Sequence, residues 1–400
     1  PDEIRARYDL VSFDPRGTGH SRPIQCIDDK TNDALNAIDP TPNSDADLPK
    51  FYDGTNYPID LVAQCVARNG SWLAEVGSRN VARDLDRLRA ALGDDRLTYL
   101  GYSYGTVIGA VYGQMFPERV GRLVLDSAVN LSSTPLEELR AGATGFENAL
   151  DEFLANCARH TRCEFHSRGD PVTALHSLQT RFEQGLTLPA TTITGKRSRR
   201  RVGAAAFYTA LIAALYDKDY GWPALAQGLF LAQQGDGSVL QILADDYNGR
   251  HDGGTYDNTD QAIGVILCDD RNDPVPPFDD YVAEYHRALA TYPFLGGYMG
   301  STVLGCDPRL PRPPVSETLG DVRVTGTRPI LVLGTTKDPA TPYAGSKDLA
   351  ARIAGSRLLT FDSTEHTAYT RNRCIDDAVD AYFLDGKLPA TGKRCVGSGP

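Results

Sequence analysis

The sequence predicts an α/β protein with a mostly parallel sheet, helices on both faces and an inserted helical cap. Three observations predict this class. Short apolar runs alternate with helical patterns near the N-terminus, a long helical stretch interrupts the alternation, and two more apolar runs follow near the C-terminus. We therefore divide the chain into a first core part (1–130), a mainly helical cap (131–294) and a second core part (295–400).

The first core part contains a β-α-β-α-β pattern. "YDLVSF" (8–13) is predicted as a buried strand that ends in a Pro/Gly turn. "NVARDLDRLRAALG" has apolar residues at helical spacing and ends at Gly93. "RLTYLGYS" is predicted as a second strand, "TVIGAVYGQMF" as a buried helix, and 122–125 as a third strand. This order is typical of a parallel sheet covered by helices.

The rest of the chain completes the prediction. "PLEELRAGATGFENALDEFLANCARH" and "AAAFYTALIAALY" are predicted as helices of the cap. "RPILVLG" and "SRLLTF" then restore two buried strands, and "CIDDAVDAYFLDG" is predicted as the closing helix. A helical block inside an α/β sheet is best interpreted as a cap over the site.

Composition excludes several classes of function. The 400 residues are 41% hydrophobic and 23% charged, which is ordinary for a globular protein. The net charge of −11 argues against a nucleic acid or an anionic membrane as partner. No apolar run reaches the roughly 20 residues that span a bilayer, so we expect no membrane span. We also expect a monomer.

The eight cysteines form no C-x-x-C pair and no cluster with zinc-ligand spacing. An even number scattered along the chain favours disulfides and an oxidising compartment over buried free thiols. The sequence alone leaves many pairings open. Neighbours along the chain suggest Cys26–Cys65, Cys157–Cys163, Cys268–Cys306 and Cys374–Cys395.

Ser103 lies in "GYSYG", between Gly101 and Gly105. This is the G-x-S-x-G pattern of a nucleophile elbow, a tight strand-to-helix turn in which only small residues fit two positions before and after the serine. Alone the pattern is weak, but a predicted strand precedes it and a predicted helix follows. A dinucleotide site is disfavoured, because the turn lacks G-x-G-x-x-G.

A nucleophilic serine needs a base, and the base needs an orienting acid. Of the seven histidines, His366 alone follows a late core strand. Asp338 follows the preceding strand in "LGTTKDPATP", and we prefer it as the acid over Asp126 and Asp362. His366 would deprotonate Ser103, Asp338 would orient His366, and the Tyr104 backbone N–H would supply one oxyanion donor. This chemistry implies no metal and no cofactor.

These residues resemble the secreted tripeptidyl aminopeptidases of bacteria, a branch of the proline-iminopeptidase-like α/β-hydrolases. The segments that carry the resemblance are "DLVSFDPRGTGHSRPIQC", "LGYSYGT", "LVLGTTKDPATPYAGS" and "EHTAYTRNRCIDDAVDAYFLDGKLPATGKRC". The resemblance implies the α/β-hydrolase fold, Ser103, Asp338 and His366 as the triad, disulfides, and export with a signal peptide to a secreted or cell-surface location. It also implies release of short peptides from a free N-terminus.

Two departures from the family pattern stand out. The family carries an "HGGPG"-like segment before the "DPRG" strand, which supplies the second oxyanion N–H, and this chain begins at Pro1, after that point. We therefore expect an incomplete piece without the first strands and the oxyanion loop. Glu365 replaces the usual glycine before the histidine, and it would either raise the pKa of His366 or crowd the loop.

An exopeptidase must also bind the substrate's α-ammonium group. Asp269 and Asp270 in "LCDD" offer carboxylates in the cap, and we choose Asp270 as the candidate, with a solvated loop pair as the alternative. Two other functions stay open. One is a carboxylesterase of the same fold, and the other is a catalytically impaired binding homologue.

Overall fold

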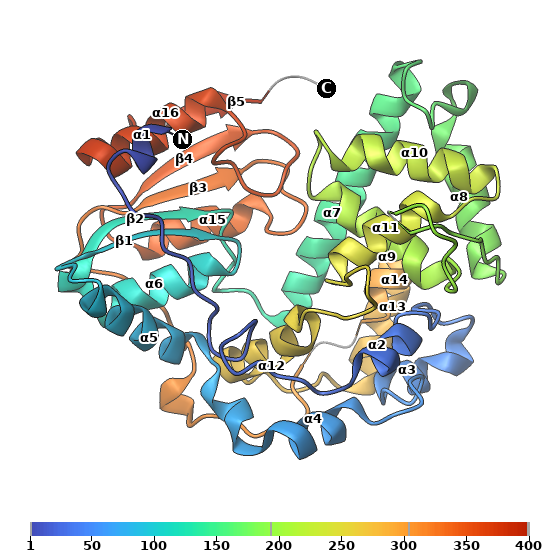
Figure 1. The fold of residues 1–400 in the computed structure, drawn as a ribbon, viewed down its shortest axis with the longest axis horizontal. Helices are drawn as coiled ribbons and strands as arrows, with labels where there is room; N and C mark the ends of the chain where they lie inside the picture. The colour runs from blue at the N-terminus through green and yellow to red at the C-terminus, as the bar shows by residue number, and fades with distance from the viewer. Residues whose placement is uncertain (1, 193, 303–304, 398–400) are drawn as a thin grey trace.

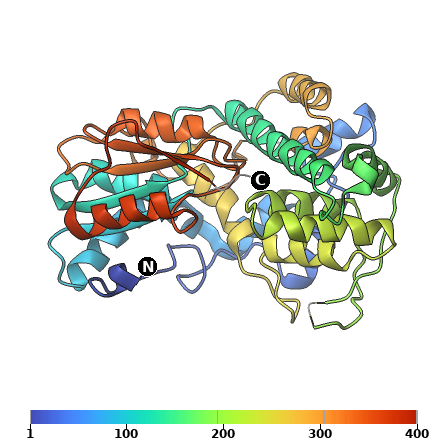
Figure 2. The same cartoon turned by 90° about the horizontal axis from the view of Figure 1, so that it is seen from above.

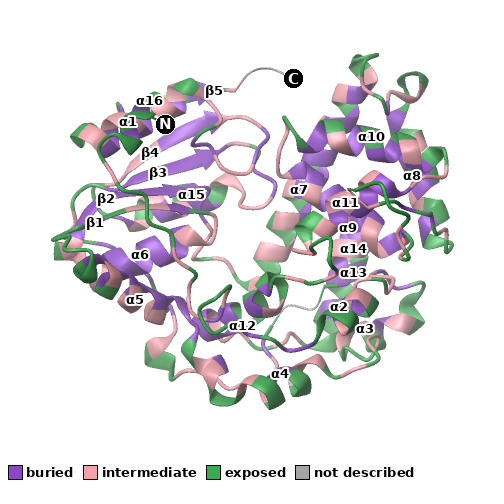
Figure 3. Cartoon of the chain, in the orientation of Figure 1, coloured by how far each residue is buried: buried purple, intermediate pink, exposed green. Residues whose placement is uncertain are grey.

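Five parallel strands form one sheet in the order β1-β2-β3-β4-β5. The computed structural model describes residues 2–192, 194–302 and 305–397. The strands are β1 (Leu97–Tyr102), β2 (Val120–Asp126), β3 (Leu331–Thr335), β4 (Arg357–Asp362) and β5 (Arg394–Val396). β2 and β3 are almost wholly buried, as expected for a parallel sheet with helices on both faces (Figure 3).

Helices cover both faces of this sheet (Figure 1). On one face α5, α6 and α15 pack against Leu123, Leu125 and Val332, and on the other α1 and α16 pack against Val124 and Leu331. The bounds of these helices are α1 (Asp2–Arg5), α5 (Ser78–Ala91), α6 (Gly105–Met115), α15 (Tyr343–Arg352) and α16 (Arg373–Asp385).

A helical cap lies beside the sheet in both views of the ribbon (Figures 1 and 2). It contains α7 (Pro135–Arg159), α8 (Pro171–Glu183), α9 (Ala204–Leu215), α10 (Gly221–Gln233), α11 (Ser238–Tyr247), α13 (Phe278–Thr291) and α14 (Gly296–Gly300). Helix α12 (Thr259–Arg271) lies in the same insertion but packs on Ile24, Leu73 and Val76, which precede α5. The cap has its own core, in which Phe153, Phe182, Phe207 and Leu211 are almost completely buried. The cap is therefore a second packed unit.

Three short helices before α5 lie along the base of the molecule (Figure 1). They are α2 (Asp29–Leu35), α3 (Leu48–Tyr52) and α4 (Leu61–Asn69). Leu48 of α3 packs on Tyr281 and Tyr285 of α13. Residues that precede the first strand thus cover part of the cap.

One predicted element is wrong. Residues 8–13 form no strand, and Leu10 and Val11 are 69% and 54% exposed. Apolar character alone does not make a strand, because a strand also needs a neighbour that accepts and donates ladder hydrogen bonds. Within the described residues, β1 pairs with β2 alone, so 8–13 runs without such a partner.

The other predicted core elements are confirmed to within a few residues. They are α5, β1, α6, β2, β3, β4 and α16. The structure also contains the disulfides Cys26–Cys65, Cys157–Cys163, Cys268–Cys306 and Cys374–Cys395, which are the neighbouring pairs suggested by sequence order. In the described part of the chain, no helix combines the length and apolar character that crossing a membrane requires.

Candidate active site

Ser103 lies on the turn between β1 and α6, at the carboxyl end of the sheet. Its φ of +50° is in the left-handed region that side-chain-bearing residues seldom adopt. A Cβ on Gly101 would lie 2.4 Å from the carbonyl oxygen of Gly105, so the turn closes only around glycine there. The strand, turn and helix that a nucleophile elbow requires are therefore present.

The first turn of α6 and the end of β2 hold this elbow. The Ser103 N–H donates to the carbonyl oxygen of Asp126 (2.9 Å), and the hydroxyl of Thr106 donates to the carbonyl oxygen of Ser103 (2.6 Å). The Tyr104 N–H makes no hydrogen bond within the residues described. It is free to donate to a negatively charged oxygen held near Ser103, at a helix N-terminus that favours such charge.

Asp338 and His366 form a hydrogen-bonded pair at the ends of the next two strands. The His366 Nδ1 atom lies 3.0 Å from Asp338 Oδ1 and 3.1 Å from Asp338 Oδ2. The backbone N–H groups of Ala340 (3.0 Å) and Thr341 (2.9 Å) also donate to the Asp338 carboxylate. This side chain has no solvent exposure, so its position is set by its hydrogen bonds.

The carboxylates of the two other candidate acids, Asp126 and Asp362, bind groups other than the His366 ring. The Asp126 carboxylate accepts backbone N–H groups that follow His366, and Asp362 pairs with Arg394 (2.9 Å). Hydrogen bonds in the described chain do not join Ser103 directly to His366. Such bonds are often long before substrate binds.

The cap reaches the histidine through Tyr216, directly after α9. The backbone N–H of His366 donates to the carbonyl oxygen of Tyr216 (3.0 Å). The Tyr216 and His366 rings also meet edge to face, with their centroids 5.2 Å apart. Next to this contact, Arg371 forms an ion pair with Asp217 (2.5 Å). Sequence reasoning missed Tyr216, because no local pattern links a cap residue to a loop 150 positions later.

A cavity of about 1030 Å³ separates core and cap, and we call it the Ser103 cavity. Ser103, Tyr104 and Tyr216 line it, together with apolar residues such as Leu267 and Leu319. Its charged lining residues are Glu137, Glu138, Asp270, Asp273 and Arg271. Carboxylates thus outnumber the basic side chain, and the cavity favours a cationic group.

Asp270 lines this cavity but its oxygens are already in use. They accept from the Ser78 N–H (2.6 Å), the Ser78 hydroxyl (2.5 Å) and the Tyr104 hydroxyl. Burial raises the pKa of Asp270, and the donors oppose that effect. The neighbouring Asp269 accepts from the Val76 N–H and does not line the cavity.

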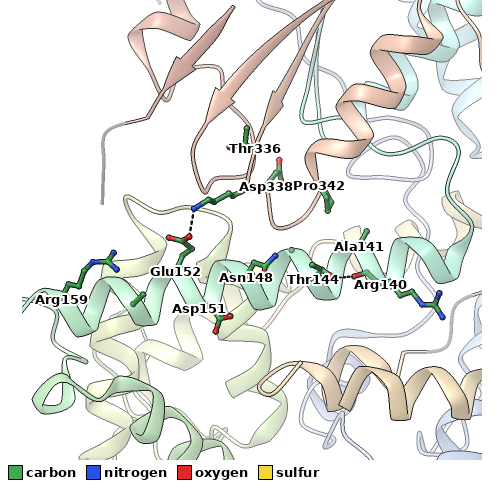
Figure 4. A pocket seen from close by; sticks show the side chains of 13 residues that line it. Arg140, Ala141, Thr144, Asn148, Asp151, Glu152, Arg159, Thr336, Asp338 and Pro342 are labelled. Atoms are coloured by element: carbon green, nitrogen blue, oxygen red, sulfur yellow. Dashed lines mark hydrogen bonds and ion pairs between the residues drawn. The ribbon is translucent and has the colours of Figure 1, made fainter. Parts of the chain in front are cut away.

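A second cavity of about 820 Å³ lies on the far side of the Asp338 loop, along α7 (Figure 4). Thr336, Asp338 and Pro342 lie there opposite α7, and Lys337 forms an ion pair with Glu152 of α7 (2.5 Å). Ala141 and Pro342 line both cavities. The loop that carries Asp338 is therefore held between the sheet and the cap.

Glu365 is buried beside the histidine. Its side chain accepts from the Ser363 hydroxyl (3.2 Å), and burial raises the pKa of its carboxyl.

Groups of three or more His, Cys, Asp or Glu side chains able to hold a metal ion do not occur among the described residues.

The chain matches two family models. Residues 2–169 match the model described as alpha/beta hydrolase fold, and residues 292–395 match the one described as TAP-like protein. Together with the parallel sheet and the elbow, these matches define the class: the protein is a hydrolase of the α/β-hydrolase fold.

Bacterial relatives narrow the family assignment. Serine protease Hip1 of Mycobacterium tuberculosis is 39% identical, over 99% of this chain and 76% of that protein. Carboxylesterase B of M. tuberculosis is 38% identical, over 98% and 74% of the two chains. Tripeptidyl aminopeptidase of Streptomyces lividans is 32% identical, over 97% and 70%. The chain belongs to the tripeptidyl aminopeptidase family of serine hydrolases, as its sequence motifs predict.

Proposed function

We propose that this protein is a serine exopeptidase that releases short peptides, tripeptides in particular, from free N-termini. The observation that carries the proposal is the contact of His366 Nδ1 with the buried Asp338 carboxylate, at the same end of the sheet as the elbow serine. A serine, a histidine and an acid that orients it are the parts that acyl transfer requires.

In the proposed mechanism, His366 Nε2 takes the hydroxyl proton of Ser103 as its Oγ attacks the carbonyl carbon of the scissile bond. The oxyanion that forms accepts the Tyr104 N–H. His366 then gives the proton to the leaving amine, and the C–N bond breaks. Water, deprotonated by His366, then attacks the carbonyl carbon of the acyl-enzyme. The bond between that carbon and Ser103 Oγ breaks, His366 returns the proton to Oγ, and the peptide is released. Asp338 keeps Nδ1 protonated and stabilises the histidine cation.

The acidic lining of the Ser103 cavity supports a substrate with a free α-ammonium group. Four acidic side chains and one basic side chain, Arg271, line the cavity, and Arg271 forms ion pairs with Glu138 and Asp273. Asp270 belongs to this acidic set, and its oxygens accept hydrogen bonds from Ser78 and Tyr104. We also propose that the enzyme is secreted or held at the cell surface, because four disulfides are typical of proteins outside the cytosol.

The test compares a free-amine tripeptide p-nitroanilide, its N-acetylated form and a short-chain p-nitrophenyl ester. We expect release of p-nitroaniline from the free amine, almost none from the acetylated form, and none from either with Ser103→Ala. Equal rates on the free and acetylated peptides would refute the exopeptidase proposal. Hydrolysis of the ester alone would favour the second candidate, an esterase, which the 38% identity to Carboxylesterase B supports.

A further inference from the structure

The end of β2 holds two buried side chains that bind the segment after His366. The Asp126 carboxylate accepts the Ala368 N–H (3.0 Å to one oxygen and 3.1 Å to the other) and the Tyr369 N–H (2.8 Å). The Ser127 hydroxyl accepts the Thr367 N–H (3.0 Å). Asp126 and Ser127 have no solvent exposure. Three consecutive N–H groups that follow His366 thus bind two consecutive side chains.

Asp126 also reaches the nucleophile. Tyr102, directly before Ser103, pairs with Asp126 in the sheet, and the Ser103 N–H donates to the Asp126 carbonyl oxygen (2.9 Å). Asp126 is therefore bonded through its backbone to the serine turn and through its carboxylate to the histidine loop. Hydrogen bonds in the described chain do not join Ser103 and His366 directly. Asp126 provides a bonded connection between them, in addition to the contacts of His366 with Asp338 and Tyr216.

Backbone geometry at both ends of this connection is strained. Ser127 has φ +59° and Thr367 has φ +75°, and a β-branched residue seldom adopts such a value. Conformations of this kind persist only where surrounding contacts enforce them. Here the hydrogen bond between Ser127 and Thr367 joins the two strained residues to each other.

The carboxylate is suited to accept these donors. Burial raises the pKa of Asp126 to about 6, while the Tyr369 and Ala368 N–H groups oppose that effect. The carboxyl is thus mainly ionised at neutral pH. An ionised carboxylate only accepts hydrogen bonds, and those from N–H groups to a charged acceptor are the stronger kind.

We propose that Asp126 and Ser127 are positioning residues for catalysis: they hold the His366 loop at the distance from Ser103 that proton transfer requires. The inference rests on the proposed roles of Ser103 and His366. It gives Asp126 a different part from that of the triad acid, because the His366 ring is bonded to Asp338 and the Asp126 carboxylate to the backbone beyond it.

The test measures kcat and KM of Asp126→Asn and Ser127→Ala on the free-amine tripeptide p-nitroanilide, well below the melting temperature of each variant. A misplaced base impairs the chemical step and leaves the cavity intact. We therefore expect Asp126→Asn to lower kcat by about 10²-fold with little change in KM. Ser127→Ala should show a smaller loss in the same direction, since it removes one of the hydrogen bonds.

Ser346→Ala is the matched control. Ser346 is equally buried, its hydroxyl accepts the Ala128 N–H (3.1 Å) and donates to Leu333 O (2.9 Å), and it makes no hydrogen bond to the His366 loop. It should lose stability and keep its kcat. A purely structural role for Asp126 would lower the melting temperature in the same way and leave kcat unchanged.

Four results would overturn the proposal. One is an unchanged kcat in folded Asp126→Asn, and another is an equal loss of kcat in Ser346→Ala. If Asp126→Asn does not fold, an unchanged kcat in Ser127→Ala decides against it. Finally, activity retained by Ser103→Ala would refute the proposed function and, with it, the inference. If Ser103→Ala is inactive but the Asp126 and Ser127 variants have normal activity, only the inference is refuted.

Discussion

At the scale of single residues, buried carboxylates do most of the positioning around this site. Asp338 lies within hydrogen-bond distance of His366 Nδ1, Asp126 accepts backbone N–H groups of the loop beyond it, and Asp270 accepts the Tyr104 hydroxyl. Each is almost completely buried, and each accepts several N–H or O–H donors. Burial favours the neutral form of a carboxyl group, and N–H or O–H donors favour the charged form. At Asp126 and Asp270 burial is the larger effect, so the pKa of each is raised.

Asp269, next to Asp270 on α12, also has a raised pKa. Burial raises its pKa to about 7, and one of its oxygens has no hydrogen-bond partner. A carboxyl whose pKa is higher in the folded state binds more protons when folded, so its contribution to stability falls as pH rises from about 4 to about 7.

Asp269→Asn should remove that loss, because the amide oxygen still accepts the Val76 N–H. We expect the stability of the variant relative to the wild type to increase by at least about 1 kcal/mol between pH 4.5 and pH 7.5. Urea unfolding at several pH values measures this difference. If the stability difference between Asp269→Asn and the wild type did not change between pH 4.5 and pH 7.5, the raised pKa of Asp269 would be contradicted.

At the scale of elements, the strand-turn-helix around Ser103 depends on one glycine. Gly101→Ala would place a methyl group 2.4 Å from the Gly105 carbonyl oxygen and 2.7 Å from the Tyr99 ring. Backbone on one side cannot yield, so we expect a loss of about 1–3 kcal/mol in unfolding free energy together with loss of activity.

Gly264→Ala provides the control for that change. Gly264 lies inside α12 with nothing within 4 Å of an added methyl group. Alanine there should raise stability by about 0.5–1 kcal/mol and leave activity unchanged. Thermal unfolding and an activity assay of both variants measure these effects. If Gly101→Ala were as stable and as active as the wild type, the elbow geometry described above would be wrong.

The elements around the site differ in how far sequence predicts them. β1, α6 and β2 were predictable, because their apolar patterns and the G-x-S-x-G turn are local. Residues 8–13 have the same local pattern, yet they form no strand, since pairing depends on a neighbour that the pattern does not specify.

The strand order predicts the residues of the candidate triad, but it does not predict the contacts that hold them in place. Asp338 and His366 each follow a predicted strand, which places them at one edge of the sheet. The Tyr216 and Ser127 contacts arise only when the cap and β2 meet the His366 loop, and no spacing in the sequence encodes them. The sequence shows Asp126 as a carboxylate that follows a strand, but it does not predict that the Ala368 and Tyr369 N–H groups bind it.

At the scale of the whole molecule, the cap and the sheet share the site. The insertion between β2 and β3 supplies the carboxylates that line the Ser103 cavity and contacts His366 through Tyr216, while the loops after the strands supply Ser103, Asp338 and His366. The net charge of −11 reinforces a field that attracts cationic groups toward the cavity.

Glu137→Gln tests this field with little change in structure. Glu137 is exposed at the start of α7, where it forms a capping box with Thr134, and glutamine also serves in such a box. We expect KM for the free-amine substrate to rise a few-fold at low salt, with the effect shrinking as salt is added. An equal rise in KM for the ester substrate would show that charge is not responsible.

The central claim is that Ser103 is a nucleophile activated by His366 and Asp338, and covalent labelling with a fluorophosphonate tests it most directly. Mass spectrometry of the labelled wild-type protein should locate the adduct on Ser103, with labelling at least about 10²-fold slower in Asp338→Asn. Asp362→Asn, a change at the nearby acid paired with Arg394, should label at the wild-type rate. An unlabelled Ser103 in the wild type, or full-rate labelling in Asp338→Asn, would contradict the claim.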